Sequence, residues 1–252
     1  MTLTQDKLTV KIFTTTKDMS LSAALEVSTK IKELLKEKET INMIFAAAPS
    51  QSEFFKSLVA TEGIEWNRIN AFHLDEYIGL DENAPQRFGN FLRRELFDLV
   101  PFRSINYLNG QNSLDGECER YGRLLKESPT DIACIGIGEN GHIAFNDPHV
   151  ADFQDKEVVK VVELDQMCRQ QQVNDKCFEN LADVPTHALT LTIPTILSAP
   201  AVFCIVPYKS KAKAVYNTIR GEITEACPAS ILRKKEGAVL FLDADSGSLL
   251  NN

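Results

Sequence analysis

The sequence has 252 residues, of which 44% are hydrophobic and 25% charged, close to the average for globular proteins. This length supports a large buried core, and we expect residues 1–252 to form a single domain. The formal net charge is −8 and the isoelectric point about 5.1, which argues against broad binding to nucleic acid or to an anionic membrane.

Neither end of the chain carries a recognisable targeting or membrane segment. The amino-terminal stretch MTLTQDKLTVKIF lacks the long apolar region of a signal peptide, and no run approaches the ~18 apolar residues of a membrane span. None of the six cysteines forms a C-x-x-C pair, and several lie in apolar runs. We therefore expect a cytoplasmic protein with free thiols and without zinc.

Apolar runs typical of strands alternate with amphipathic stretches typical of helices along most of the chain. In chain order we expect strand 8–13, helix 19–38, strand 41–48, helix 52–60, strand 69–77, helix 88–96, strand 131–138, strand 187–193, strand 201–206, helix 210–219 and strand 237–243. The apolar face of the first helix is predicted to contain Leu21, Leu25, Ile31, Leu34 and Leu35.

This alternation predicts an α/β fold: a doubly wound, Rossmann-like, mostly parallel sheet with helices on both faces. Ligands of such sheets bind beyond the carboxyl ends of the strands. Three polar clusters fall at those ends: APSQS (48–52), LDEY (74–77) and GENGH (138–142). We expect the three loops to meet in one pocket.

The glycine-rich segment 136–148 contains a candidate acid–base group. Its glycines, including Gly138, let the backbone turn tightly and approach a ligand. His142 exchanges a proton near neutral pH, and Asn140 and Asp147 are close enough in sequence to orient its ring. A plain strand-to-helix turn, with a histidine capping a carbonyl, fits the segment equally well.

Asp75 and Glu76 end the third predicted strand. A carboxylate in that position is partly desolvated and more basic, as a base that removes a proton next to a carbonyl requires. Without further context, a helix N-cap explains this pair better.

The segment after the second strand is a candidate anion site. Ser50 and Gln51 precede a helix start, where backbone N–H groups and the helix dipole favour a phosphate. Lys211, Lys176 and Arg169 are the candidate cations for it. The alternative is a serine-capped helix with solvated surface cations. We assign the remaining histidines structural or surface roles: His73, His149 and His187.

Four segments together give the chain a family resemblance: HLDEY-x-GL (73–80), GIG-x-NGHIAFN (136–146), VPTHALTLTI (184–193) and K-x-K-A (211–214). From about residue 12 to residue 243 the chain resembles the glucosamine-6-phosphate deaminase/isomerase family, which shares its fold with 6-phosphogluconolactonases. Lactonases typically have G-H-T-A-S where this chain has GHIAFN (141–146), which favours the deaminase side.

The resemblance implies a role for each candidate residue. Asp75 falls where the family has the base that moves a proton between C2 and C1, and His142 where it assists ring opening. Asn140 and Asp147 support the histidine. Ser50 and its loop, with Lys211, correspond to the phosphate site, and Lys176 to a family arginine. The implied partner is a small sugar phosphate, and neither a cofactor nor a metal is expected.

The chain also departs from the family pattern. The phosphate loop, usually T-G-G-T-P, reads AAPSQ (47–51), where Pro49 removes an N–H donor, so Arg169 is expected to help. Asp147 replaces a glutamate. Val158 replaces an arginine of the allosteric site in hexameric members, so we expect no such regulation, and a homo-oligomer stays open.

Three alternative functions remain. The first is a 6-phosphogluconolactonase in which His142 activates water. The second is a sugar-phosphate-sensing domain, although the sequence enters a strand where such regulators carry a helix-turn-helix. The third is a deaminase for another amino-sugar phosphate, such as the galactosamine epimer.

Overall fold

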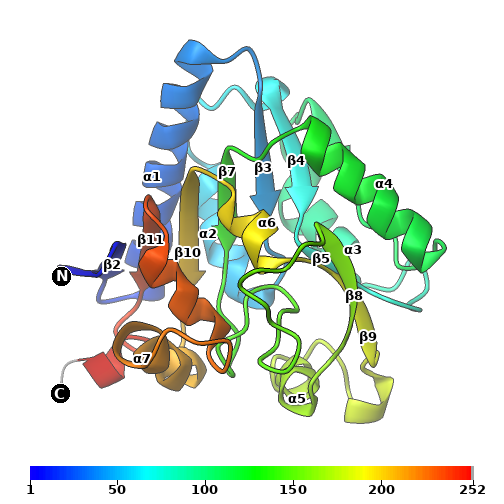
Figure 1. Cartoon of the computed structure of the whole chain (residues 1–252). Coiled ribbons are helices and arrows are strands. Elements are labelled where there is room, and N and C mark those ends of the chain that lie inside the picture. Colours follow the sequence, from blue (N-terminus) through cyan, green and yellow to red (C-terminus); the bar gives the residue numbers. More distant parts are fainter. Residues whose placement is uncertain (251–252) are drawn as a thin grey trace.

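An eight-stranded sheet forms the centre of the structure, a computed structural model that describes residues 1–250 (Figure 1). Its strands, in spatial order, are β1 (Thr2–Gln5), β2 (Leu8–Ile12), β11 (Ala238–Leu242), β10 (Ala201–Val206), β7 (Ile132–Ile135), β3 (Ile41–Phe45), β4 (Ile69–His73) and β6 (Ser104–Asn106). All neighbours run parallel except β1, which is antiparallel to β2. The predicted α/β fold with a mostly parallel sheet is confirmed.

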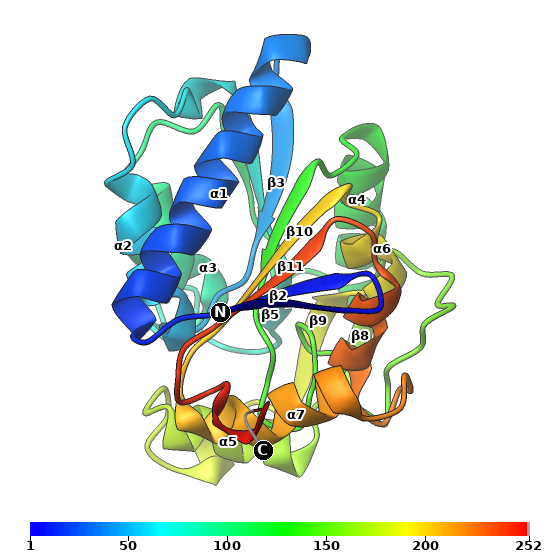
Figure 2. The ribbon, with the colours of Figure 1, turned by 90° about the vertical axis from the view of Figure 1, so that its left-hand side faces the viewer.

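Helices cover both faces of this sheet and its carboxyl edge. The helices are α1 (Thr16–Glu37), α2 (Ser52–Val59), α3 (Phe88–Leu92), α4 (Leu114–Glu127), α5 (Gln166–Asn174), α6 (Ile193–Leu197) and α7 (Ala212–Arg220). Figure 2 shows α1, α2 and α3 on one side of the sheet and α4 and α6 on the other. α5 and α7 lie beyond the carboxyl ends of the strands in both views.

The first helix buries only part of the predicted apolar face: Ile31 and Leu35 are buried and Leu34 is half-buried. Thr15 caps α1 by accepting a hydrogen bond from the Asp18 N–H (3.1 Å). Its buried apolar residues are Met19, Ala23, Ala24, Val27, Ile31 and Leu35. The prediction was wrong for Leu21 and Leu25, which are 48% and 51% exposed. Most of the buried residues follow one i, i+4 row from position 19, and positions 21 and 25 lie outside that row.

The predicted strand 69–77 is two strands in two sheets. β4 ends at His73, whereas β5 (Asp75–Tyr77) joins a separate antiparallel sheet with β9 (His187–Leu191) and β8 (Val159–Glu163). The chain changes sheets at Leu74, whose C=O accepts a hydrogen bond from the Leu191 N–H (2.8 Å). The expectation of one sheet was therefore wrong for 75–77 and 187–191, since these pair antiparallel to each other.

Several short or polar elements escaped the sequence analysis. They are β1, β6, β8, α4, α5 and α6. α5 has the composition QMCRQQQVN and little amphipathic pattern, so its hydrophobic periodicity is weak. Its start is set by Asp165, whose side chain accepts from the Met167 and Cys168 N–H groups.

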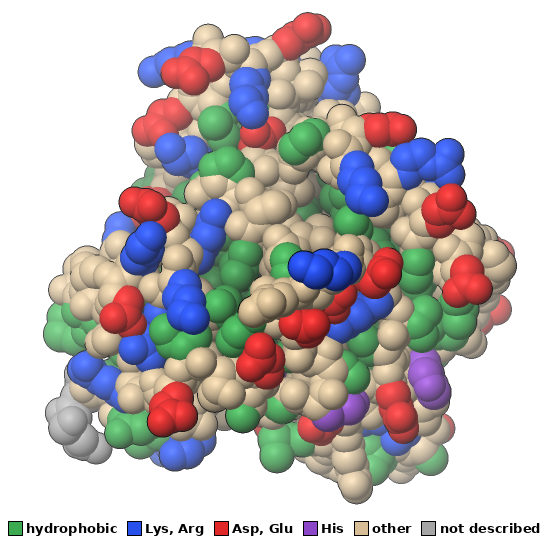
Figure 3. Space-filling model, viewed as in Figure 1, with side chains coloured by type: hydrophobic (Ala, Val, Ile, Leu, Met, Phe, Trp, Pro, Cys, Tyr) green, Lys and Arg blue, Asp and Glu red, His purple; other side chains and the backbone are tan. Residues whose placement is uncertain are grey.

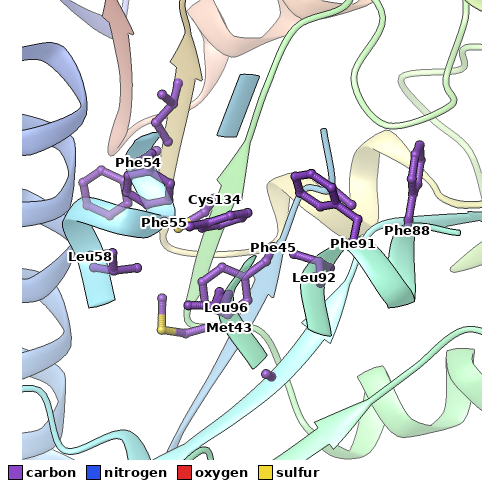
Figure 4. Packing of buried hydrophobic residues seen from close by; sticks show 14 of the residues in the cluster. Met43, Phe45, Phe54, Phe55, Leu58, Phe88, Phe91, Leu92, Leu96 and Cys134 are labelled. Carbon is purple, nitrogen blue, oxygen red and sulfur yellow. The ribbon is translucent and has the colours of Figure 1, made fainter. Parts of the chain in front are cut away.

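A cluster of aromatic rings on one face of the sheet supports the loop that follows β3. Phe45 packs edge-to-face against Phe55, Phe97 and Phe102, with ring centroids 5.9–6.2 Å apart. Figure 4 shows Phe45 beside residues of α2 and α3. Burial of each phenylalanine side chain stabilises the fold by about 1.5–3 kcal/mol. The loop at 46–51 therefore starts from a rigid platform.

The surface and the cysteines add two further findings. Lys and Arg are interspersed with Asp and Glu on the face in Figure 3, and neither sign dominates there. None of the helices described over residues 1–250 has the length and hydropathy of a bilayer span. All six cysteines are unpaired, and those at positions 134, 168, 204 and 227 are buried.

Candidate active site

The loops after β3, β4 and β7 line one cavity at the carboxyl edge of the sheet. Six of the residues proposed from the sequence line it: Ser50, Gln51, Asp75, Gly138, His142 and Lys211. The cavity is narrow and encloses ≈ 60 Å³, although ≈ 500 Å³ is empty when the open mouth is included. A ligand the size of a sugar phosphate would therefore extend into the mouth.

Asp75 presents an unpaired carboxylate to this cavity. The residue is 5% exposed, and no group within residues 1–250 donates a hydrogen bond to its side chain. Phe88 and Phe145, whose rings stack with centroids 5.4 Å apart, give the same cavity an apolar wall. Burial first, and then the negative charge of Glu76, raises the pKa of Asp75 well above its ordinary value. The result is a carboxylate more basic than a solvated one.

Glu76, the next residue, has a structural environment. Its two carboxylate oxygens accept hydrogen bonds from the N–H groups of Tyr77, Phe88 and Gly89 at 2.9–3.0 Å. Two of these N–H groups lie in the first turn of α3. The helix-capping interpretation therefore applies to Glu76 and leaves Asp75 free.

His142 lies against a buried carboxylate. Its Nδ1 is 2.9 Å from Oδ1 of Asp147, although the N–H direction is not aligned for a hydrogen bond. Asp147 is fully buried and accepts hydrogen bonds from Asn140 Nδ2 (2.9 Å) and from the Asp165 N–H (3.2 Å). Burial opposes ionisation of Asp147, but the close contact with His142 and the hydrogen bond from Asn140 outweigh it and lower the pKa of Asp147. Asp147 thus stays a carboxylate that orients the ring.

The glycine-rich turn fits around the histidine ring. A Cβ on Gly138 would lie 2.1 Å from the Cε1 atom of His142, so only glycine leaves room for the imidazole. The Gly138 N–H donates to the His142 C=O (3.0 Å), and Asn140 Oδ1 accepts from the His142 N–H (3.0 Å). Gly141 has a φ of +88°, a conformation that favours glycine.

Lys211 provides an isolated buried cation. It is 4% exposed, and within residues 1–250 no acidic side chain forms an ion pair with it. Burial lowers its pKa, and the more distant charges of Asp175 and Glu139 partly offset that effect. The turn before it is held by Asp243, whose carboxylate accepts from the Tyr208 N–H (3.1 Å). A buried ammonium without a partner marks a place where an anion binds favourably.

The loop at 49–51 lies across the same cavity, and its two polar side chains differ. Gln51 Nε2 donates to the C=O of Ile205 (3.0 Å), which ties the loop to β10. Gln51 is thus anchored through its amide nitrogen, whereas its Oε1 has no partner. Ser50 lines the cavity and is half-buried.

Two proposed cations lie outside the cavity. Arg169 donates through Nη2 to the C=O groups of Leu181 and Val184, both at 2.8 Å. The structure thus does not support the expectation that Arg169 helps to hold phosphate, because its guanidinium is used to fold the segment after α5. Lys176 is exposed and lines a neighbouring hollow on the far side of Ala48 and Pro49.

The sequence analysis missed two residues of α5 that line the cavity, Gln171 and Gln172. Gln171 Oε1 accepts a hydrogen bond from the Glu139 N–H (2.9 Å), which joins α5 to the glycine-rich turn. The one available signal was Asp165 as an N-cap, which predicts a helix here. Which of its glutamines turn inward depends on how that helix packs.

One group of side chains has the composition of a metal site. A nitrogen of His142, an oxygen of Asp147 and Sγ of Cys168 lie within 4.8 Å of one another. Among the residues described, this is the one group of potential metal ligands that lie so close together. However, Asp147 already accepts hydrogen bonds from Asn140 Nδ2 and from the Asp165 N–H, and it contacts the His142 ring. We interpret the group as a packed hydrogen-bonding network around the histidine.

A parallel α/β sheet thus carries, at its carboxyl edge, a basic carboxylate, an oriented histidine and an isolated buried cation. The chain belongs to the glucosamine-6-phosphate isomerase/6-phosphogluconolactonase family, whose model matches residues 14–241.

Comparisons with individual proteins agree with this assignment. A glucosamine-6-phosphate deaminase of Streptococcus sanguinis (strain SK36) is 35% identical over 234 residues, which cover 87% of this chain and 93% of that protein. A deaminase of Streptococcus pneumoniae serotype 4 is 35% identical over 225 residues, covering 86% and 93%.

Solved structures show the same fold. A monomeric glucosamine-6-phosphate deaminase superposes with a TM-score of 0.86 at 31% identity, covering 95% of this chain and 99% of that one. A 6-phosphogluconolactonase from Thermotoga maritima gives a TM-score of 0.77 at 20% identity, covering 94% and 100%, and supports the fold alone.

Proposed function

We propose that this protein is an amino-sugar phosphate deaminase that converts glucosamine 6-phosphate, or a close epimer, into a ketose 6-phosphate and ammonia. The observation that carries the proposal is the unpaired, buried carboxylate of Asp75, which lines one cavity together with His142 and Lys211. The relatives that cover most of the chain are named as glucosamine-6-phosphate deaminases.

The phosphate binds at the end of the cavity formed by Lys211 and the Ser50 loop. An anion there gives the buried ammonium the partner that it lacks. A hydrogen bond to a charged group contributes about 1.5–3 kcal/mol. This anchor places the reacting carbons near Asp75.

His142 transfers the proton that opens the sugar ring. Asp147 stabilises the imidazolium that forms when the imidazole of His142 takes up a proton. Asn140 holds Asp147 in place by donating a hydrogen bond from its side-chain amide (2.9 Å). The same contacts fix the orientation of the imidazole toward the cavity.

Asp75 then moves a proton between neighbouring carbons. It removes the proton from C2 of the open-chain amino sugar while the C1 carbonyl oxygen takes up a proton, which gives an enolamine. Return of a proton to C1, with loss of a proton from the amino nitrogen, then gives an imine at C2. The imine at C2 adds water, and the C–N bond breaks to release ammonia and the ketose. General acid–base steps of this kind each contribute about 10²–10⁴ in rate.

An assay of ammonia release tests the proposal. The protein is incubated with glucosamine 6-phosphate, galactosamine 6-phosphate and mannosamine 6-phosphate, and in parallel with 6-phosphogluconolactone. We expect ammonia and a ketose phosphate from at least one hexosamine. Hydrolysis of the lactone without ammonia from any amino sugar would instead identify a lactonase, the activity named for the structural relative from Thermotoga maritima.

A further inference from the structure

The side-chain amide of Gln172 is accessible from the cavity and has no hydrogen-bond partner in the described part of the chain. The residue is 7% exposed and lines the cavity with Asp75, His142 and Lys211. None of the hydrogen bonds found over residues 1–250 involves the Gln172 side chain. The side chains of Gln170 and Gln171, in contrast, both form hydrogen bonds within the protein. Since this amide faces the cavity without a partner from the protein, a ligand in the cavity is the group that can hydrogen-bond to it.

The position of Gln172 on α5 places it between the two ends of the cavity. Cys168, four residues earlier on the same face, has its Sγ within 4.8 Å of the side chains of Asp147 and His142. Asp175, at the other end of α5, is near enough to Lys211 for its charge to act on that ammonium. Gln172 thus lies about one helical turn from the histidine end, toward the lysine end.

We propose that Gln172 binds the hydroxyl groups in the middle of the sugar and thereby determines which hexosamine epimer the enzyme accepts. The inference rests on the proposed deaminase function, in which phosphate occupies the Lys211 end and the reacting carbons the Asp75 end. The carbons between them carry hydroxyls, which both donate and accept. An amide is the matching side chain, because it offers two donors on nitrogen and an acceptor oxygen.

The surroundings of Gln172 favour a specificity role over phosphate binding. Phosphate has only acceptor oxygens at its surface and is bound best by charged donors, of which Lys211 already supplies one. Gln171, the neighbour of Gln172, fixes the helix by accepting from the Glu139 N–H (2.9 Å). The α5 backbone that carries Gln172 is therefore held in place before the sugar arrives, which favours discrimination between epimers.

The test compares Gln172→Met with Gln170→Met, the same substitution on the exposed face of the same helix. We measure kcat/KM for glucosamine 6-phosphate and galactosamine 6-phosphate, and inhibition by inorganic phosphate. For Gln172→Met we expect kcat/KM for the preferred epimer to fall about 10- to 100-fold, as loss of a hydrogen bond with a buried partner predicts. The preference between epimers should fall at least about fivefold, while phosphate inhibition stays within about twofold. Gln170→Met should match the wild type.

The inference is wrong if Gln172→Met keeps the wild-type kcat/KM or the wild-type preference between epimers. It is also wrong if the wild type shows no preference between epimers. A fourth outcome against it is that inhibition of Gln172→Met by inorganic phosphate weakens in proportion to the fall in kcat/KM. Calorimetric binding of a non-reacting hexitol 6-phosphate gives a second readout that needs no turnover. If the wild type releases no ammonia yet binds the hexitol phosphate more tightly than Gln172→Met does, the deaminase proposal fails while the contact with the sugar stands. Equal hexitol binding by both proteins rejects the contact itself.

Discussion

Asp75 and Glu76 are adjacent carboxylates with opposite uses. Glu76 accepts three backbone hydrogen bonds, which compensate part of its buried charge, although burial still raises its pKa. Asp75 receives none and is nearly inaccessible to solvent, so ionising it costs free energy. This unfavourable group lies where the proposed mechanism requires a base that removes a proton from carbon. Residues that destabilise the fold are typical of catalytic positions.

We predict that Asp75→Asn lowers kcat by at least about 10²-fold and also stabilises the fold. Because the folded protein raises the pKa of Asp75, the stability linked to this group is lost as pH rises through that raised value. Above that pKa the ionised carboxylate destabilises the protein, and Asn removes that cost, about 1.4 kcal/mol per pKa unit. Thermal unfolding and single-turnover kinetics measure the two effects. A variant with wild-type kcat would show that another residue is the base.

The same raised pKa predicts the acid limb of the pH–rate profile. Asp75 acts as a base only when ionised, so kcat/KM should rise with pH through the pKa of Asp75 in the free enzyme. That midpoint should lie clearly above 3.8, the ordinary value for aspartate. The measurement is kcat/KM against pH in buffers of constant ionic strength. An acid limb at the ordinary aspartate value would contradict the desolvated environment described for this carboxylate.

At the scale of elements, the site depends on contacts between segments that lie far apart in the sequence. The glycine-rich turn after β7 holds His142, and α5 holds that turn through Gln171 and Glu139 (2.9 Å). The turn itself leaves no space for a side chain at Gly138. The glycine-rich turn and α5 together thus fix the position of the His142 imidazole.

Gly138→Ala should displace the imidazole and lower kcat about 10²-fold or more, because the new Cβ would lie 2.1 Å from the ring. Gly122→Ala on α4 is the matched control, since its Cβ would meet Val158 at an ordinary distance of 3.5 Å. That control should keep full activity and gain a little stability, as Ala replaces Gly in a helix. The readouts are kcat, KM and thermal unfolding of both variants. Normal turnover by Gly138→Ala would show that the ring position is not needed.

At the scale of the whole molecule, ligand binding should couple to global stability through the buried ammonium. Since no acid pairs with Lys211 among the residues described, we expect bound phosphate to compensate its charge and to stabilise only the folded state. The predictions of a single domain, of the oligomeric state and of a cytoplasmic location stay predictions, and one structural relative is described as monomeric.

We predict that inorganic phosphate raises the unfolding temperature of the wild type but not of Lys211→Met. At a phosphate concentration 100 times the Kd, the stabilisation amounts to about 2.7 kcal/mol. Lys211→Met should also raise KM for the sugar phosphate about 10- to 100-fold, as loss of a charge-assisted contact predicts. Without ligand it should be at least as stable as the wild type, because an unpaired buried charge is removed. Equal phosphate stabilisation in both proteins would place the anion elsewhere.

The sequence by itself determined the elements whose hydrophobic pattern is strong. The apolar runs at β3, β7, β10 and β11 predicted a parallel sheet, and the motifs around Asp75 and His142 predicted the family. These signals are local, since they depend on residue type and spacing within one segment.

Only the tertiary structure decided the rest. The change of sheets at Leu74 frees Asp75 from the main ladder, and the packing of α1 exposes Leu21 and Leu25. The packing of α5 turns Gln172 inward and Arg169 away from the cavity, although both belong to one polar segment. Such outcomes depend on which distant backbone each side chain meets, and short-range periodicity contains no record of those contacts.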